Sequence, residues 1–490
     1  MNEFRVLAPT AILGYGFPES SFENGMKKKP HVIAVDAGST DPGPYYLGSG
    51  KSFTDRNAVK RDLEYMLKAG IAENIPVIIG SAGGCGADSH LDWTVDVVRE
   101  ISREMNLTFK MAVIGAQIDK NVVLQHFKNG DLKAMSSVPP LTESQITNST
   151  NIVAQMGVEP FIKALDAGAQ VIVAGRAYDP TVFACLAIKN GFDTGLAMHM
   201  GKILECATIA CTPGSGSDCM FGTLRDDHFI LEPLSDARKC TTLSVAAHTL
   251  YEKSDPTKLP GPGGVLDLDE CVFEQLTENS VRVSKTKFIP DKNYYIKLEG
   301  AMPKGHRTVS IAAASDPIFI ENIDSIVAAV KERVASNFSY TNSASSMKIA
   351  GQARNDRRAS HSGQPCHSGL DPQSNNYFLD FKVYGTSGVL LMETSSATNK
   401  RPAEICIVIE AVAQTAEMAN TICSFARSSL LHFGYPGRKS TAGNLAFPFS
   451  PSDFEAGEVF NFSVYTLMPS PNPCMYFPIT INLCDKGDLT

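Results

Sequence analysis

Polar residues that could do chemistry gather in three short stretches of the chain. Each stretch directly follows an apolar, β-branched run: 36–41 (DAGSTD), 80–90 (GSAGGCGADSH) and 175–179 (GRAYD). Carboxylates and histidine are suited to general acid/base catalysis. Arginine and glycine-rich backbone bind carboxylates or phosphates. The three stretches together predict acid–base chemistry on a small anionic molecule.

The first stretch places Asp36 and Asp41 five residues apart, with Ser39 and Thr40 between them. The two carboxylates could act as catalytic acid and base or bind a divalent cation, and the two hydroxyls could contact the substrate. The alternative is an Asx-type turn that satisfies its own backbone. The sequence leaves both interpretations open.

The second stretch is a glycine-rich loop between an expected strand and helix. The backbone around Ser81, Gly83, Gly84 and Gly86, with the N-terminus of the next helix, favours an anion. Asp88 and His90 beside it are further acid–base candidates. The alternative is that Ser89 caps a helix and the glycines permit close packing. The stretch is only a partial dinucleotide fingerprint, with Ser in place of the third Gly, so a nicotinamide cofactor has weak support.

Two further charged positions complete the candidate site. Arg176 follows the expected strand Val171–Ala174 and could clamp a carboxylate or phosphate, or form a structural ion pair with Asp179. If residues 198–206 are helical, Lys202 and Glu205 lie on one face at spacing i, i+3.

The elements that position these residues alternate regularly in the first 225 residues. Short apolar strands separated by helices predict an α/β domain with a doubly wound, mostly parallel sheet. Residues 226–470 mix alternating strands with helices and predict an α+β region of one or two domains. Inside it, the polar stretch 337–376, with its two His-Ser-Gly triplets, reads as a disordered insertion. Residues 471–490 are expected to be a tail.

Composition excludes several classes of protein. The chain has 490 residues, 43% hydrophobic and 20% charged, with a net charge of −8, so no basic platform for nucleic acid is expected. No run of 18 apolar residues predicts a membrane span. The 12 cysteines include no CxxC pair, which argues against a structural zinc site and favours a reduced, cytoplasmic protein.

Several long phrases carry a family resemblance. They include VDAGSTDPGPYYLG (35–48), GSAGGCGADSH (80–90), GRAYDP (175–180), LPGPGG (259–264) and GNLAFPFSPSD (443–453). Over about residues 3–470 the chain resembles the acyclic terpene utilisation (AtuA-like) family. The resemblance implies a setting in the breakdown of acyclic terpenes such as citronellol and geraniol, and no residue role. The insertion departs from the family pattern. Some relatives carry a small C-terminal domain that this chain lacks, which a small partner subunit could supply.

We therefore expect a cytoplasmic, homo-oligomeric catabolic enzyme with hydratase or lyase chemistry on a small branched carboxylate or its coenzyme A thioester. Asp36 and Asp41 could bind a divalent cation, and coenzyme A could enter as part of the substrate. The alternatives are a non-catalytic binding or scaffold subunit and a nucleotide-dependent oxidoreductase. The catalytic candidates are Asp36, Asp41, Asp88, His90 and Glu205, and the binding candidates are Ser39, Thr40, Ser81, Gly83, Gly84, Gly86, Arg176 and Lys202.

Overall fold

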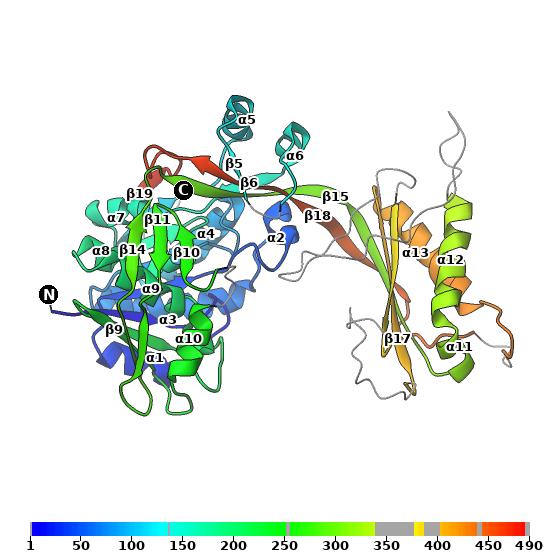
Figure 1. Ribbon diagram of the computed structural model, residues 1–490, viewed down its shortest axis with the longest axis horizontal. Helices are drawn as coiled ribbons and strands as arrows, with labels where there is room; N and C mark the ends of the chain where they lie inside the picture. Colours follow the sequence, from blue (N-terminus) through cyan, green and yellow to red (C-terminus); the bar gives the residue numbers. More distant parts are fainter. Residues whose placement is uncertain are drawn as a thin grey trace. The chain divides into compact units, whose positions relative to one another are not determined.

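The chain folds into two compact units in the computed structural model (Figure 1), which describes residues 2–135, 138–250, 255–338, 377–386, 402–438 and 443–485. The first unit comprises residues 1–302 and 462–490, and the second comprises 303–461. The domain boundary expected at 225/226 falls inside a hairpin of the first unit. There β8 (Met220–Leu224) pairs with β9 (His228–Pro233), so the sheet continues across that point.

A ten-stranded mixed sheet forms the centre of the first unit. Its five central strands run parallel in the order β1-β2-β3-β7-β4, while β8, β9, β13 and β12 on one side and β19 on the other pair antiparallel. The α/β class is therefore confirmed, but the sheet is mixed rather than mostly parallel. The remaining strands of this sheet are β1 (Phe4–Ala8), β2 (Val32–Asp36), β3 (Val77–Gly80), β7 (Val171–Ala174), β4 (Phe109–Ile114), β13 (Val281–Ser284), β12 (Val272–Gln275) and β19 (Ile479–Cys484).

Strand β19 lies in the segment expected to be a tail. Its residues pair with β4 from Ile479 opposite Ile114 to Cys484 opposite Phe109. The pairing covers the edge of β4 that would otherwise expose unpaired backbone groups.

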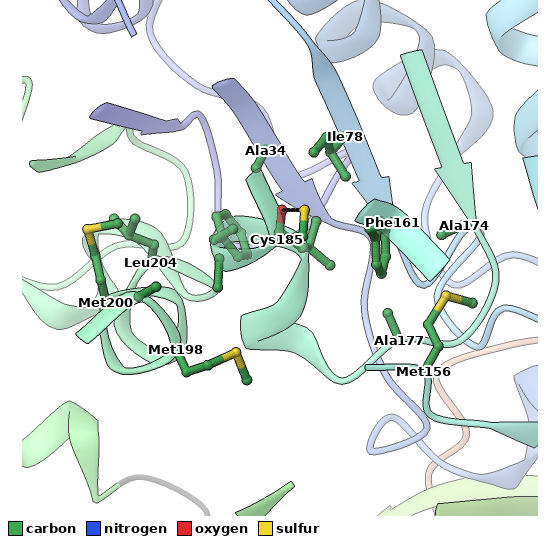
Figure 2. Close-up of a cluster of buried hydrophobic side chains, with 14 of the residues drawn as sticks. Ala34, Ile78, Met156, Phe161, Ala174, Ala177, Cys185, Met198, Met200 and Leu204 are labelled. Atoms are coloured by element: carbon green, nitrogen blue, oxygen red, sulfur yellow. Dashed lines mark hydrogen bonds between the residues drawn. The ribbon is translucent and has the colours of Figure 1, made fainter. Parts of the chain in front are cut away.

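Both faces of the parallel strands are buried, which explains their continuous apolar sequences. In β2, Val32 and Ala34 enter one core while Ile33 and Val35 enter the other. Figure 2 shows part of the first core, with Phe161 near Ala174, Cys185 near Ala34, and Met200 beside Leu204. The first core takes side chains from α5 (Lys120–Asn129), α6 (Glu143–Asn148), α7 (Glu159–Asp166), α8 (Asp179–Lys189), α9 (Thr194–Leu204) and α10 (Thr242–Thr249), and the second from α1 (Glu19–Lys27), α3 (Arg56–Ala72) and α4 (Asp88–Met105).

Smaller elements complete the first unit. The long strand β15 (Tyr295–Ala314) starts here, and its residues 298–301 pair with β6 (Asn151–Ala154). Likewise, the end of β18 (Asp453–Pro469) pairs with β5 (Lys133–Ala134). A separate three-stranded sheet contains β10 (Lys258–Gly261), β11 (Gly264–Asp267) and β14 (Lys287–Pro290), and the short helices are α2 (Pro44–Ser49) and η1 (Ala207–Ala210).

The second unit packs helices on an antiparallel sheet. Strand β17 (Ile405–Ala413) pairs with β16 (Tyr377–Tyr384) and with residues 306–314 of β15. Its core takes side chains from these strands and from α11 (Pro317–Glu321), α12 (Ile323–Phe338) and α13 (Ala416–Leu431). Residues 337 and 338 of the expected insertion end α12, and 339–376 lie outside the described residues.

None of the helices in the described segments combines the length and apolar character needed to cross a membrane.

Candidate functional site

The three predicted stretches meet at the carboxyl ends of β2, β3 and β7, which are neighbours in the sheet. Their loops pack backbone against backbone. A Cβ built on Gly38 would lie 3.2 Å from Cα of Gly84, and one built on Gly86 would lie 2.0 Å from the amide nitrogen of Arg176. The approach at Gly86 leaves no room for a side chain, and the approach at Gly38 is tighter than most Cβ contacts in proteins. The glycines thus serve the close packing that was the alternative interpretation of this loop.

The glycine loop offers few free amides to an anion. The N–H groups of Ser81 and Ala82 donate to carbonyls of Gly175 and Ala174, at 3.1 and 2.9 Å. The amides of Gly84 and Gly86 donate within the loop, at 2.8 and 3.0 Å. The predicted backbone cradle is therefore largely occupied by the protein's own carbonyls.

The helix after the loop also differs from the expected anion site. Helix α4 begins at Asp88, with Ala87 as its N-cap residue and no side-chain cap, so Ser89 is not the cap. The N–H of Asp88 donates to Oε1 of Gln117 at 3.1 Å. The exposed Asp88 carboxylate in the first turn itself complements the helix dipole, which weakens the case for a second anion there.

Arg176 is nearly fully buried and binds protein groups on two sides. Its Nε donates to Oε2 of Glu299 at 2.9 Å, and its Nη1 donates to Oδ1 of Asp179 at 2.8 Å and to Oγ of Ser81 at 3.1 Å. The predicted ion pair with Asp179 is therefore present. Its Nη2 makes no hydrogen bond with the residues that the structure describes, which leaves one nitrogen for a ligand.

Ser81 joins the loop to this arginine in an uncommon backbone conformation. Its φ is +46°, in the left-handed region that non-glycine residues rarely adopt. Its hydroxyl also accepts from the amide of Ala177 at 3.4 Å. Backbone strain of this kind occurs most often at functional sites.

The sequence did not reveal the carboxylate that holds Arg176. Glu299 comes from β15, far along the chain, and its Oε1 accepts from Nζ of Lys297 at 2.8 Å and from Nε2 of Gln155 at 3.2 Å. Burial alone would raise the pKa of Glu299, but the adjacent Arg176 and Lys297 lower it to about 2. One signal was available, since Lys297 and Glu299 sit two residues apart and so share one face of a strand.

Lys202 and Glu205 form the predicted pair near the end of α9. Their side chains make a buried ion pair at i, i+3. Burial opposes the charge on Lys202, yet the neighbouring Glu205 raises its pKa, and Asp179 contributes in the same direction. Tyr178 is partly buried; burial raises its pKa, and the charges of Glu205, Lys202 and Asp179 also act on it. The pair therefore continues the network around Arg176.

We define the charge cluster as three cations and three carboxylates, which balance in formal charge: Arg176, Lys202, Lys297, Asp179, Glu205 and Glu299.

Asp36 adds a seventh ionisable group to this balanced cluster. It is 4% exposed, its Oδ2 accepts from the N–H of Gly38 at 3.0 Å, and its Oδ1 has no hydrogen-bond partner among the described residues. Burial, and then the negative charge of Asp179, raise the pKa of Asp36 well above its usual range, although the charge of Arg176, the Gly38 amide and the Ser81 hydroxyl act in the opposite direction. Since the cluster is already balanced, the protonated, neutral form of Asp36 is favoured.

Asp41 lies apart from this environment on the surface. Its Oδ2 accepts from Oγ of Ser39 at 2.6 Å, and its amide donates to the same hydroxyl at 3.1 Å, so this turn satisfies itself. Thr40 is buried beside it. Across the described ranges, no group of three or more His, Cys, Asp or Glu side chains is placed to hold a metal ion. A cation on Asp36 and Asp41 would therefore lack a third such ligand in this part of the chain.

Asp88 and His90 occupy different environments. The side chain of Asp88 is exposed at the start of α4. Its partial loss of solvent, and to a smaller extent the negative charge of Asp92, raise its pKa. His90 is fully buried, with Nε2 at 2.9 Å from the carbonyl of Lys51, and burial lowers its pKa. Only Asp88 of the two therefore meets solvent.

Comparison with known families gives a match over most of the chain. The family described as acyclic terpene utilisation family protein AtuA matches residues 52–220 and 227–448. The chain belongs to this family. Membership suggests a role in acyclic terpene utilisation, as the sequence phrases predicted. Comparisons with curated proteins and with solved structures gave no match. The AtuA match contains Ser81, Arg176 and Glu299, while Asp36 precedes it.

Proposed function

We propose that this AtuA-family chain is an acid–base enzyme of acyclic terpene utilisation. Its reaction would add water to, or remove water from, a small branched carboxylate or its coenzyme A thioester. One observation carries the proposal: Asp36 is a buried carboxyl group, and its burial and the charge of Asp179 raise its pKa well above the usual range. A carboxylic acid that stays neutral near pH 7 can serve as a proton donor.

The chemistry needs two roles from the protein. In dehydration, protonated Asp36 would give its proton to the departing hydroxyl, which leaves as water, while a second carboxylate of the candidate set, Glu205 or Asp88, would take the proton from the neighbouring carbon. In hydration, that second group would return its proton to the carbon, and the carboxylate of Asp36 would accept a proton from the attacking water. Positioned proton transfer of this kind contributes about 10²–10⁴-fold to rate. The reaction is redox-neutral, so it requires no electron carrier.

Arg176 is the proposed anchor for the anionic end of the substrate. Two carboxylates and a hydroxyl fix its guanidinium through Nε and Nη1, so Nη2 is held in one orientation. A preorganised cation in a water-poor setting binds a carboxylate, or the oxygen of a thioester carbonyl, with little loss of entropy. Ser81 contacts the same guanidinium and would support this orientation.

The experiment compares Asp36→Asn with Asp41→Asn. Wild type and both variants would be incubated with a panel of branched unsaturated carboxylates, their hydroxylated forms and the coenzyme A thioesters. Water enriched in oxygen-18 and mass spectrometry would report addition or loss of water. We expect Asp36→Asn to lose about 10²–10⁴-fold in turnover. Asp41→Asn, which alters an exposed turn with the same chemical change, should retain turnover.

Two outcomes would replace the proposal. Full turnover by Asp36→Asn would remove Asp36 from the reaction. Binding of panel members by wild type, seen as a shift in melting temperature without any turnover, would favour the non-catalytic binding subunit. A shift caused by a dinucleotide would favour the oxidoreductase, although Gly84 and Gly86 are occupied in packing against neighbouring loops.

A further inference from the structure

Two cysteines lie against each other in the first unit, separate from the proposed catalytic groups. The Sγ atoms of Cys211 and Cys240 are 3.5 Å apart, and both residues are free thiols. Cys211 directly follows η1, and Cys240 lies two residues before α10. They are 4% and 0% exposed.

The backbone at this pair has the geometry that a disulfide requires. Thr212 and Lys239 exchange two hydrogen bonds, at 2.8 and 3.0 Å, and form an isolated antiparallel bridge. Cys211 and Cys240 are the next residues outward, so they face each other at a non-hydrogen-bonded position. At such positions the Cα atoms lie about 4.5 Å apart, with the side chains close. Disulfides span Cα separations of about 4.4–6.8 Å.

We propose that Cys211 and Cys240 are a redox-active pair that closes to a disulfide under a two-electron oxidant of the hydroperoxide class. The contact with Cys211, and then burial, raise the pKa of Cys240, so Cys211 is assigned as the attacking thiolate. Its attack on the peroxide oxygen yields a sulfenic acid and releases water or an alcohol. The second thiol then attacks that sulfur, forms the S–S bond and releases water. Each sulfur loses one electron, and the O–O bond is reduced.

Exposed residues adjoin the pair along the chain. Thr212 and Pro213, next to Cys211, are exposed, and Leu243 in the first turn of α10 is 79% exposed. The closed bond would tie the end of η1 to the start of α10 across 29 residues that include the β8–β9 hairpin. Oxidation would therefore link the two ends of this sheet hairpin and leave the charge cluster chemically unchanged.

The experiment oxidises the native full-length protein. Reduced protein, freed of reductant, is treated with hydrogen peroxide, quenched with an alkylating reagent and digested without reduction. We expect the loss of two titratable thiols, their recovery with dithiothreitol, and a cross-linked peptide that contains Cys211 and Cys240. The oxidised protein should also melt at a higher temperature than the reduced protein.

Variants make the assignment specific. Cys211→Ala and Cys240→Ala should each abolish the reversible loss of two thiols, while Cys219→Ala, a change at another buried cysteine close by in sequence, should preserve it. The proposal is overturned if the cross-link maps to other cysteines, if Cys211→Ala still loses two thiols, or if the bond forms only in urea. The wild-type peptide map decides the question alone if a variant does not fold.

Discussion

Replacing Glu299 by Gln tests whether the charge cluster holds the candidate site together. The change keeps the shape of the side chain but leaves Arg176 and Lys297 without their shared carboxylate. The pKa of Glu299 falls from an ordinary 4.5 to about 2. At about 1.4 kcal/mol per pH unit, that shift corresponds to roughly 3 kcal/mol of stability. Breaking a buried ion pair typically costs about 3–5 kcal/mol, which agrees with this magnitude.

The assay follows unfolding of the first unit alone. Trp93, the single tryptophan of the chain, lies in α4, so its fluorescence in a urea titration reports on this unit. Because the folded-state pKa of Glu299 is lowered, its contribution is present above pH 4.5 and is lost as the pH falls toward about 2. The difference between wild type and Glu299→Gln should therefore be large at pH 7 and shrink in acid.

The matched control is Glu270→Gln. Glu270 pairs with Lys287 at 2.9 Å, the same separation as the Arg176–Glu299 contact, but both partners are exposed. Solvent screening makes exposed pairs weak, so this variant should unfold close to wild type. A loss of stability no larger for Glu299→Gln than for Glu270→Gln would refute the reasoning about buried charge.

Two further predictions concern the loop and Asp36. Gly86→Ala should strongly lower the melting temperature, because the new Cβ would lie 2.0 Å from the backbone nitrogen of Arg176 and φ is +68°. Gly130 has a similar φ of +73° but open space around it, so Gly130→Ala should lower the free energy of unfolding by only about 1–2 kcal/mol. Similar melting temperatures for the two variants would contradict the packing argument. The raised pKa of Asp36 makes the unfolding free energy of wild type depend on pH. It should fall by about 1.4 kcal/mol for each unit that the pH rises between the usual Asp range and the raised pKa. Urea titrations of Asp36→Asn at several pH values should lack this slope. An identical slope in both proteins would show that Asp36 ionises normally.

The sequence predicted the part of the site that local patterns determine. Continuous apolar runs located β2, β3 and β7, and polar residues directly after them converge because neighbouring parallel strands end at one edge. The spacing of Lys202 and Glu205 likewise predicted their contact on one helical face.

Non-local strand pairing accounts for what the sequence could not reveal. Residues 148–168 contain two elements, β6, which pairs with β15, and then α7. Gly157 and Pro160 inside that stretch are poor residues for a helix interior. The pairing places Gln155 and Glu299 together, and it depends on residues almost 150 positions apart.

The same limit applies to the sheet and to Arg176. Antiparallel partners such as β8 and β19 join the parallel strands through contacts that alternating hydrophobicity does not specify. The role of Arg176 depended on Glu299, which binds its guanidinium. The two residues lie far apart along the chain, so the sequence did not indicate that they are in contact.

The central claim is that Asp36 carries a proton near neutral pH. Infrared difference spectra of protein labelled with carbon-13 at aspartate carboxyls, wild type against Asp36→Asn, measure this directly. The proposed function requires a carboxylic acid C=O band at pH 7 in wild type that is absent from Asp36→Asn. Finding only carboxylate bands for Asp36 at that pH would contradict the claim and the acid–base function proposed from it.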